Sequence, residues 1–140
     1  MPKNAPFTVR LDPGLESQIE ALARRSHRSK GAVLEELASE AERSRRYPGI
    51  SFRGPDWSRR AWVLGTSLDV WELIQAFQDF GGDAEAMLAG SDLNRRQLEI
   101  AFAYYREFGA EIDEAIAANR RSLDELSKEY PFAQVLTVVE

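Results

Sequence analysis

The sequence predicts a mainly α-helical protein: a strand followed at once by two helices, then a small helical domain with a short C-terminal strand. Two observations lead to this fold class. Apolar and polar residues alternate over residues 7–12, whereas residues 13–46 repeat apolar residues at helical spacing. Residues 59–130 hold further segments with helical spacing, separated by glycines. One short strand and two helices are too small to close a core alone, so the opening segment predicts pairing with an identical chain.

The opening strand is expected over residues 7–12, where Phe7, Val9 and Leu11 alternate with Thr8 and Arg10. The three apolar side chains would then pack on the helices, and the other two would face away. Two such strands, antiparallel about a twofold axis, form a ribbon that fits the DNA major groove. Arginine can bind guanine with two hydrogen bonds, and threonine offers a hydroxyl and a methyl group. Thr8 and Arg10 are therefore candidate base readers, although the same alternation occurs on any half-exposed strand.

Two helices are expected next. Asp12 is a helix cap with Pro13 at the first helical position, and this helix should stop near Ser26. Ser29 is the next cap, and the second helix should continue to about Arg46.

The start of the second helix is a candidate phosphate site. Free amides at a helix start attract anions, and Lys30 adds a mobile positive charge. Gly31 would leave those amides uncovered. Ser29, Lys30 and Gly31 form this candidate site, and the alternative is that Ser29 is an ordinary cap.

The chain's net charge of −5 is unevenly distributed. Residues 1–46 carry nine basic and seven acidic residues, whereas residues 47–140 carry nine basic and sixteen acidic residues. The first part is therefore mildly basic and suits contact with phosphate. The second part is acidic and suits a basic protein partner.

The second half is expected to contain a linker over residues 47–58, a helical domain over 59–130 and a tail over 131–140. The linker is rich in proline and glycine. The helical domain should open with a short strand, Arg60 to Leu64, and continue with helices that end near residues 81, 89, 108 and 130. Its helix, short helix, turn and longer helix fit a helix-turn-helix order, although three-helix units are common.

Two further surfaces in this half are candidate binding sites. Asn94, Arg95 and Arg96 begin the third helix, where a reader helix carries its base contacts, but the surrounding acidic charge would oppose DNA. The tail is apolar and β-branched and should form a strand that adds to a sheet edge, in its own dimer or in a partner protein. Its candidate partner-binding residues are Phe132, Val135, Leu136 and Val138.

Several functional classes lack their parts in this sequence. There is no cysteine and one histidine, His27, so disulfides and a cysteine nucleophile are excluded, and a zinc site or an acid–base site lacks a second histidine. No phosphate loop or dinucleotide motif is present. We expect no enzymatic activity, no metal and no cofactor. No run of about 18 apolar residues and no signal peptide is visible, so we expect no membrane partner and a cytoplasmic location.

Residues 5–46 resemble the ribbon-helix-helix DNA-binding family of the Arc, MetJ and CopG repressors. The segments FTVRLD and LESQIEALARRSHRSKGAVLEELASEA carry this resemblance. It implies a dimer whose strand residues Thr8 and Arg10 read bases, while Ser29, Lys30 and Gly31 grip phosphate. The chain departs from the family in the turn Ser26-His27, where glycine is frequent, and at Gly31, where a second serine is common.

Residues 47 to about 120 resemble a family of small VapB-type antitoxins. The matching motifs are Pro48-Gly49-Ile50, Gly65-Thr66, Val70-Trp71-Glu72, Tyr104-Tyr105 and Glu111-Ile112-Asp113. Commoner members have a proline where this chain has Leu68. The resemblance implies a PIN-like ribonuclease toxin as the protein partner.

The sequence therefore predicts an antitoxin-type transcriptional repressor. Residues 1–46 would form a homodimer and bind double-stranded operator DNA, and residues 59–130 with the tail would bind the PIN-like toxin. The alternative is a stand-alone ribbon-helix-helix regulator whose helical domain senses a small ligand or oligomerises. A third class, a structural or adaptor protein without DNA binding, also stays open.

Overall fold

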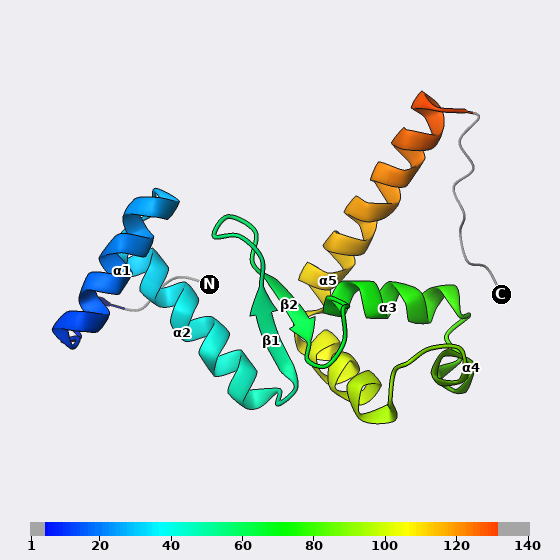
Figure 1. Ribbon diagram of the computed structural model, residues 1–140, viewed down its shortest axis with the longest axis horizontal. Coiled ribbons are helices and arrows are strands. Elements are labelled where there is room, and N and C mark those ends of the chain that lie inside the picture. The colour runs from blue at the N-terminus through cyan, green and yellow to red at the C-terminus, as the bar shows by residue number, and fades with distance from the viewer. Residues whose placement is uncertain (1–4, 132–140) are drawn as a thin grey trace. The chain divides into compact units, whose positions relative to one another are not determined.

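The computed structural model describes residues 5–131 and is mainly helical, with a small two-stranded antiparallel sheet. The chain divides into two compact units, Met1–Ala41 and Glu42–Glu140, which are described separately. The observed order is two helices, two strands and three helices (Figure 1). The mainly helical class is confirmed. The predicted order of strands is wrong, because both observed strands lie in the middle of the chain.

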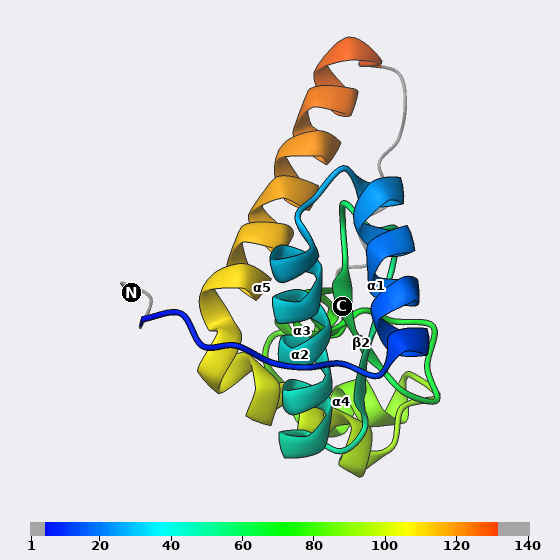
Figure 2. The same ribbon diagram turned by 90° about the vertical axis from the view of Figure 1, so that its left-hand side faces the viewer.

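The first unit contains helix α1, Pro13–Ser26, and most of helix α2, Lys30–Arg46. An Asp12 carboxylate oxygen accepts hydrogen bonds from the Gly14 and Leu15 amides at 3.0 and 3.3 Å, and Pro13 begins the helix. Figure 2 shows α1 and α2 joined at one end by a short turn. Both helix starts agree with the sequence, because Asp12 and Ser29 have the side chains that cap free amides.

The core of the first unit is small. Its buried apolar residues are Ile19, Ala23 and Val33, and the partly buried Leu11, Leu22 and Leu34 pack against them. Residues 5–12 are extended, but they belong to no strand. The predicted strand over residues 7–12 is therefore not formed within the described chain. A strand ladder needs a neighbouring strand, and none of the described residues runs beside this segment as one.

The second unit opens with a β-hairpin. Strand β1, Ile50–Arg53, pairs antiparallel with strand β2, Arg60–Val63, and places Arg53 opposite Arg60. The predicted strand beginning at Arg60 is confirmed, but β1 lies inside residues 47–58, where the sequence predicted only a linker. Gly54 permits the hairpin loop, since its φ is +111° and a Cβ there would lie 2.3 Å from the Ser58 carbonyl oxygen.

Three helices complete this unit: α3, Val70–Asp79, α4, Ala84–Ala89, and α5, Arg95–Glu129. The core gathers residues from the hairpin and from all three helices, with Tyr104 of α5 fully buried among them. The sequence predicted two helices separated near Phe108. The structure has one helix with a kink there, because Phe108 has non-helical angles (φ −109°, ψ 30°).

The predicted C-terminal strand and the tail residues Phe132, Val135, Leu136 and Val138 lie outside the described residues. Within residues 5–131, no helix is both long and apolar enough to cross a bilayer.

His27 supports a prediction about stability. It ends α1 in the left-handed region, with φ 54° and ψ 40°, where glycine is preferred over residues with a Cβ. We expect His27→Gly to raise the free energy of unfolding by up to about 1 kcal/mol, measured by urea denaturation at fixed protein concentration. Arg24→Gly, inside α1, should lower it by about 1 kcal/mol. A loss of stability in His27→Gly would contradict the strain that we assign to this residue.

Candidate functional site

The extended segment before α1 exposes large apolar side chains. Phe7 is 87% exposed and Val9 is 51% exposed, although the predicted strand would place both against the helices. Of the three apolar residues in this segment, Phe7, Val9 and Leu11, only Leu11 packs partly against the core of the first unit. Thr8 and Arg10 are exposed as well. The apolar and polar faces predicted for this segment are therefore not separated within one chain, and two apolar side chains lie uncovered beside the candidate base readers.

The segment and the start of α2 border one groove of about 400 Å³. Its lining residues are Val9, Arg10, Leu11, Glu16, Lys30, Gly31 and Leu34. The structure thus brings the candidate base reader Arg10 to the same groove as Lys30 and Gly31 of the candidate phosphate site.

The start of α2 is partly engaged by other groups of the same unit. The Ser29 hydroxyl accepts a hydrogen bond from the Ala32 amide at 3.1 Å, so Ser29 is the helix cap. Lys30 Nζ lies 2.8 Å from a Glu16 carboxylate oxygen and 3.5 Å from one of Glu20. The hydrogen bond to Glu16 is the main cause that raises the pKa of Lys30. Lys30 would have to leave these carboxylates to bind phosphate. No atom lies within 4 Å of a Cβ placed on Gly31, which leaves the amides there uncovered.

The three residues proposed as a second DNA contact have different surroundings. Asn94 and Gln97 cap α5 reciprocally: the Asn94 side chain accepts from the Gln97 amide at 2.9 Å, and the Gln97 side chain accepts from the Asn94 amide at 3.0 Å. Arg95 is paired with Glu85. Arg96 is exposed on the first turn of the helix. Asn94 and Arg95 therefore have structural roles at this helix start. The sequence alone did not distinguish these roles from reading bases.

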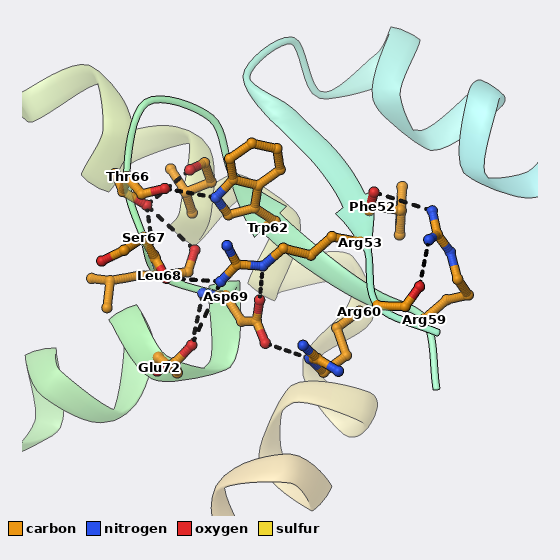
Figure 3. A network of polar contacts seen from close by, with 12 residues as sticks. Phe52, Arg53, Arg59, Arg60, Trp62, Thr66, Ser67, Leu68, Asp69 and Glu72 are labelled. Atoms are coloured by element: carbon orange, nitrogen blue, oxygen red, sulfur yellow. Dashed lines mark hydrogen bonds and ion pairs between the residues drawn. The ribbon is translucent and has the colours of Figure 1, made fainter. Parts of the chain in front are cut away.

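The second unit contains a buried carboxylate held by two arginines. Asp69, the residue before α3, is 2% exposed. Its two carboxylate oxygens accept hydrogen bonds from Arg53 Nε at 2.8 Å and Arg60 Nε at 2.6 Å (Figure 3). The arginines come from facing positions of β1 and β2. This one side chain therefore connects both strands of the hairpin to the start of α3.

The turn between β2 and α3 is held by the same network. The Trp62 indole donates a hydrogen bond to the Thr66 carbonyl oxygen at 2.7 Å, and the Arg53 guanidinium lies 5.1 Å from the centre of the Trp62 ring (Figure 3). The Glu72 carboxylate accepts from the Asp69 amide at 3.0 Å. This site was not predicted from the sequence. Its only signal is an aspartate at a helix start downstream of two arginines that flank a Gly-Pro loop.

A second cluster connects the C-terminal end of α2 to α5. Arg43 Nη1 donates hydrogen bonds to the Tyr104 hydroxyl at 3.0 Å and to a Glu111 carboxylate oxygen at 2.8 Å. Its guanidinium lies 3.8 Å from the centre of the Phe108 ring. Burial is the main cause that raises the pKa of Tyr104 to about 12, and the Glu111 charge adds to it. Arg43 therefore packs at the kink of α5.

Arg46 and Tyr47 make a similar connection one turn along α5. Arg46 Nη1 lies 2.6 Å from Glu107 and also pairs with Glu42, and the Tyr47 hydroxyl donates to Glu107. The hydrogen bond from Arg46 is the main cause that lowers the pKa of Glu107. Among residues 5–131, no group of histidines, aspartates and glutamates is arranged to hold a metal ion.

No protein-family model, curated protein or solved structure matches this chain. The function proposed below therefore rests on the residues described above.

The Asp69 network leads to a stability prediction. We expect Asp69→Asn to lower the free energy of unfolding by about 2–3 kcal/mol, because it removes the charge that both arginines pair with in a buried position. Urea denaturation of the full chain measures this loss. Asp79→Asn is the matched control, since the side chains of the Asp79–Arg120 pair are 28% and 44% exposed, against 4% for Asp69, and the pair should contribute less than about 1 kcal/mol. Equal losses in the two variants would contradict the importance that we assign to Asp69.

Tyr104 leads to a prediction about pH. Its folded pKa of about 12 lies above the ordinary value of 10.0, so its contribution to stability is complete below pH 10 and is lost as the pH rises toward 12. Between pH 10 and 12, the free energy of unfolding of the wild type should fall by about 1.4 kcal/mol more per pH unit than that of Tyr104→Phe, because phenylalanine cannot ionise. Urea denaturation at pH 8, 9, 10 and 11 measures the difference. Parallel pH profiles for the two proteins would show that Tyr104 is not protected from ionisation by the fold.

Proposed function

We propose that this protein is an antitoxin-type transcriptional repressor that binds operator DNA as a homodimer through residues 7–12. Its first unit would be a ribbon-helix-helix protomer, completed when the opening segments of two chains pair as an antiparallel ribbon. Its second unit, with the tail, would bind a PIN-like ribonuclease toxin.

The uncovered segment at residues 7–12 is the observation that carries this proposal. Phe7 and Val9 are exposed, and the core of this unit has three buried apolar residues within the described part of the chain. Pairing with a second copy would turn both side chains toward a shared core and satisfy the backbone groups of the segment. The same pairing would turn Thr8 and Arg10 to the opposite face, where they could enter a major groove.

The groove beside this segment supports contact with DNA. Arg10 borders it together with Lys30 and Gly31, so a base contact and a phosphate contact can lie next to each other. Lys30 would exchange its carboxylate partners Glu16 and Glu20 for a phosphate group, which keeps its charge compensated. Each contact between a lysine or arginine and a DNA phosphate releases counterions from the DNA, so the affinity should fall as the salt concentration rises.

The proposed toxin contact rests on the acidic second half and on the resemblance to antitoxins. Residues 47–140 have sixteen acidic and nine basic residues, which suits the basic groove of an RNA-cleaving enzyme. Trp57, 87% exposed in the hairpin loop, adds an aromatic residue of the type that dominates binding energies at interfaces.

A stand-alone regulator is the second candidate function. A groove of about 330 Å³ beside α3 and α5 favours it, because Phe77 and Phe102 line its wall together with Arg106 and Glu99. This combination of aromatic side chains with charges of both signs suits a small ligand that has an apolar body and polar groups. Binding of such a ligand without any co-purifying protein would favour this function over the antitoxin function.

DNA binding can be tested at Arg10. We expect Arg10→Ala to weaken binding to the promoter of its own gene by about 5- to 100-fold in a gel shift, since one bidentate base contact contributes about 1–3 kcal/mol. Arg45→Ala is the matched control, because Arg45 is exposed at the far end of α2.

Salt titration and co-purification complete this test. Wild-type affinity should fall steeply with salt, and Lys30→Ala should reduce that slope. Equal binding by wild type and Arg10→Ala would overturn the proposed reading face. Co-purification with the product of the adjacent gene tests the toxin contact separately.

A further inference from the structure

The groove beside the opening segment contains charges of both signs. Its lining residues include two cations, Arg10 and Lys30, and one acidic side chain among those described, Glu16. DNA would bring phosphate charges to this surface, so an acidic side chain in the groove opposes the binding that the two cations favour. Attraction of DNA therefore does not account for Glu16.

Glu16 and Glu20 hold Lys30 from successive turns of α1. A Glu16 carboxylate oxygen lies 2.8 Å from Lys30 Nζ, and one of Glu20 lies 3.5 Å from it. The two glutamates are four residues apart, so their side chains project from the same face of the helix. Glu16 makes the closer contact, and its hydrogen bond raises the pKa of Lys30 more than Glu20 does. The ammonium group of Lys30 is thus already surrounded by two carboxylates in the free protein.

The α1 helix does not need this contact in order to begin. A carboxylate oxygen of Asp12 caps the helix by accepting from the amides of Gly14 and Leu15. Glu16 lies in the first turn, where the helix dipole favours a negative charge whether or not a lysine is near. The position of Glu16 in the helix therefore leaves its contact with Lys30 available for another role.

The exposure of the contact determines how easily it can be exchanged. The side chains of Lys30 and Glu16 are 47% and 44% exposed. Ion pairs that are this exposed add little to stability and open at little cost. A DNA phosphate can therefore displace the carboxylate from Lys30, but the two anions compete for the same ammonium group.

We propose that Glu16, assisted by Glu20, is an intramolecular competitor of DNA phosphate for the ammonium group of Lys30. This inference rests on the proposed function and concerns regulation of the same groove. The carboxylates occupy Lys30 in the free protein, and a phosphate takes their place in the complex. The gain from the phosphate contact is reduced by the contact that it replaces, so the glutamates lower the affinity for a duplex of any sequence.

The competition leaves base reading unchanged, because Arg10 takes no part in the exchange. A duplex that offers phosphates alone would be bound weakly. Base contacts by Arg10 would then be needed for appreciable occupancy at the same protein concentration.

Binding of the full chain to its own promoter and to a random duplex of equal length tests the competition. We expect Glu16→Gln to bind both duplexes about two- to fivefold more tightly than the wild type, which corresponds to the strength of an exposed ion pair. Glu20→Gln should have a smaller effect, because its carboxylate lies farther from Lys30. Glu40→Gln is the matched control, since it removes the same charge from α2 outside the groove and should change both affinities far less.

A second substitution separates competition from a general gain of positive charge. In a Lys30→Gln background, Glu16→Gln should no longer tighten binding, because the group for which the carboxylate competes is absent. An equal gain in that background, or in Glu40→Gln, would overturn the competition. A purely structural role of the contact predicts the opposite sign, since its loss would weaken the fold and DNA binding together. Urea denaturation of Glu16→Gln measures that loss of stability.

Two negative results have different meanings. Promoter binding by the wild type, with equal or weaker binding by Glu16→Gln, would overturn the competition and leave the proposed function in place. Absence of binding to both duplexes by both proteins would overturn the proposed DNA binding and the competition with it.

Discussion

The size of the first unit's core is the constraint on which the proposed function depends. Three buried side chains, Ile19, Ala23 and Val33, form a small apolar core against the loss of conformational freedom in two helices. The apolar residues that could enlarge this core, Phe7 and Val9, lie exposed in the extended segment before it. A second chain can supply both the missing core and the missing strand partner. In the proposed dimer, DNA recognition would follow from completion of the fold, because the ribbon would form only in the pair.

The second unit is stabilised differently. A buried carboxylate, Asp69, fixes two strands and a helix start to one another, and the Arg43–Tyr104 contact fixes the end of α2 at the kink of α5. Such charged contacts add little over well-packed apolar groups, but they require one specific geometry. The unit thereby becomes a defined support for α5, whose second half extends beyond α3 and exposes Leu126.

Local patterns predicted the helices well. The start of α1 at Asp12, the start of α2 at Ser29 and the break at Phe108 follow from capping residues and apolar spacing, which act over a few neighbours. Strand β1 was missed because its four residues lie among prolines and glycines and are defined by pairing with β2. The pairing of Lys30 with Glu16, and of Arg53 and Arg60 with Asp69, joins residues distant in sequence. No spacing rule reveals such contacts before the fold is known.

Backbone amide hydrogen exchange over residues 7–11 tests the central claim most directly. In an antiparallel ribbon, alternate amides of this segment donate to the partner strand, so they exchange slowly, and the protection rises with protein concentration. We expect this pattern in the full chain without DNA. Exchange of all these amides at the rate of an unstructured peptide, at every concentration up to that of the gel-shift experiments, would contradict pairing through this segment and the DNA-reading surface derived from it.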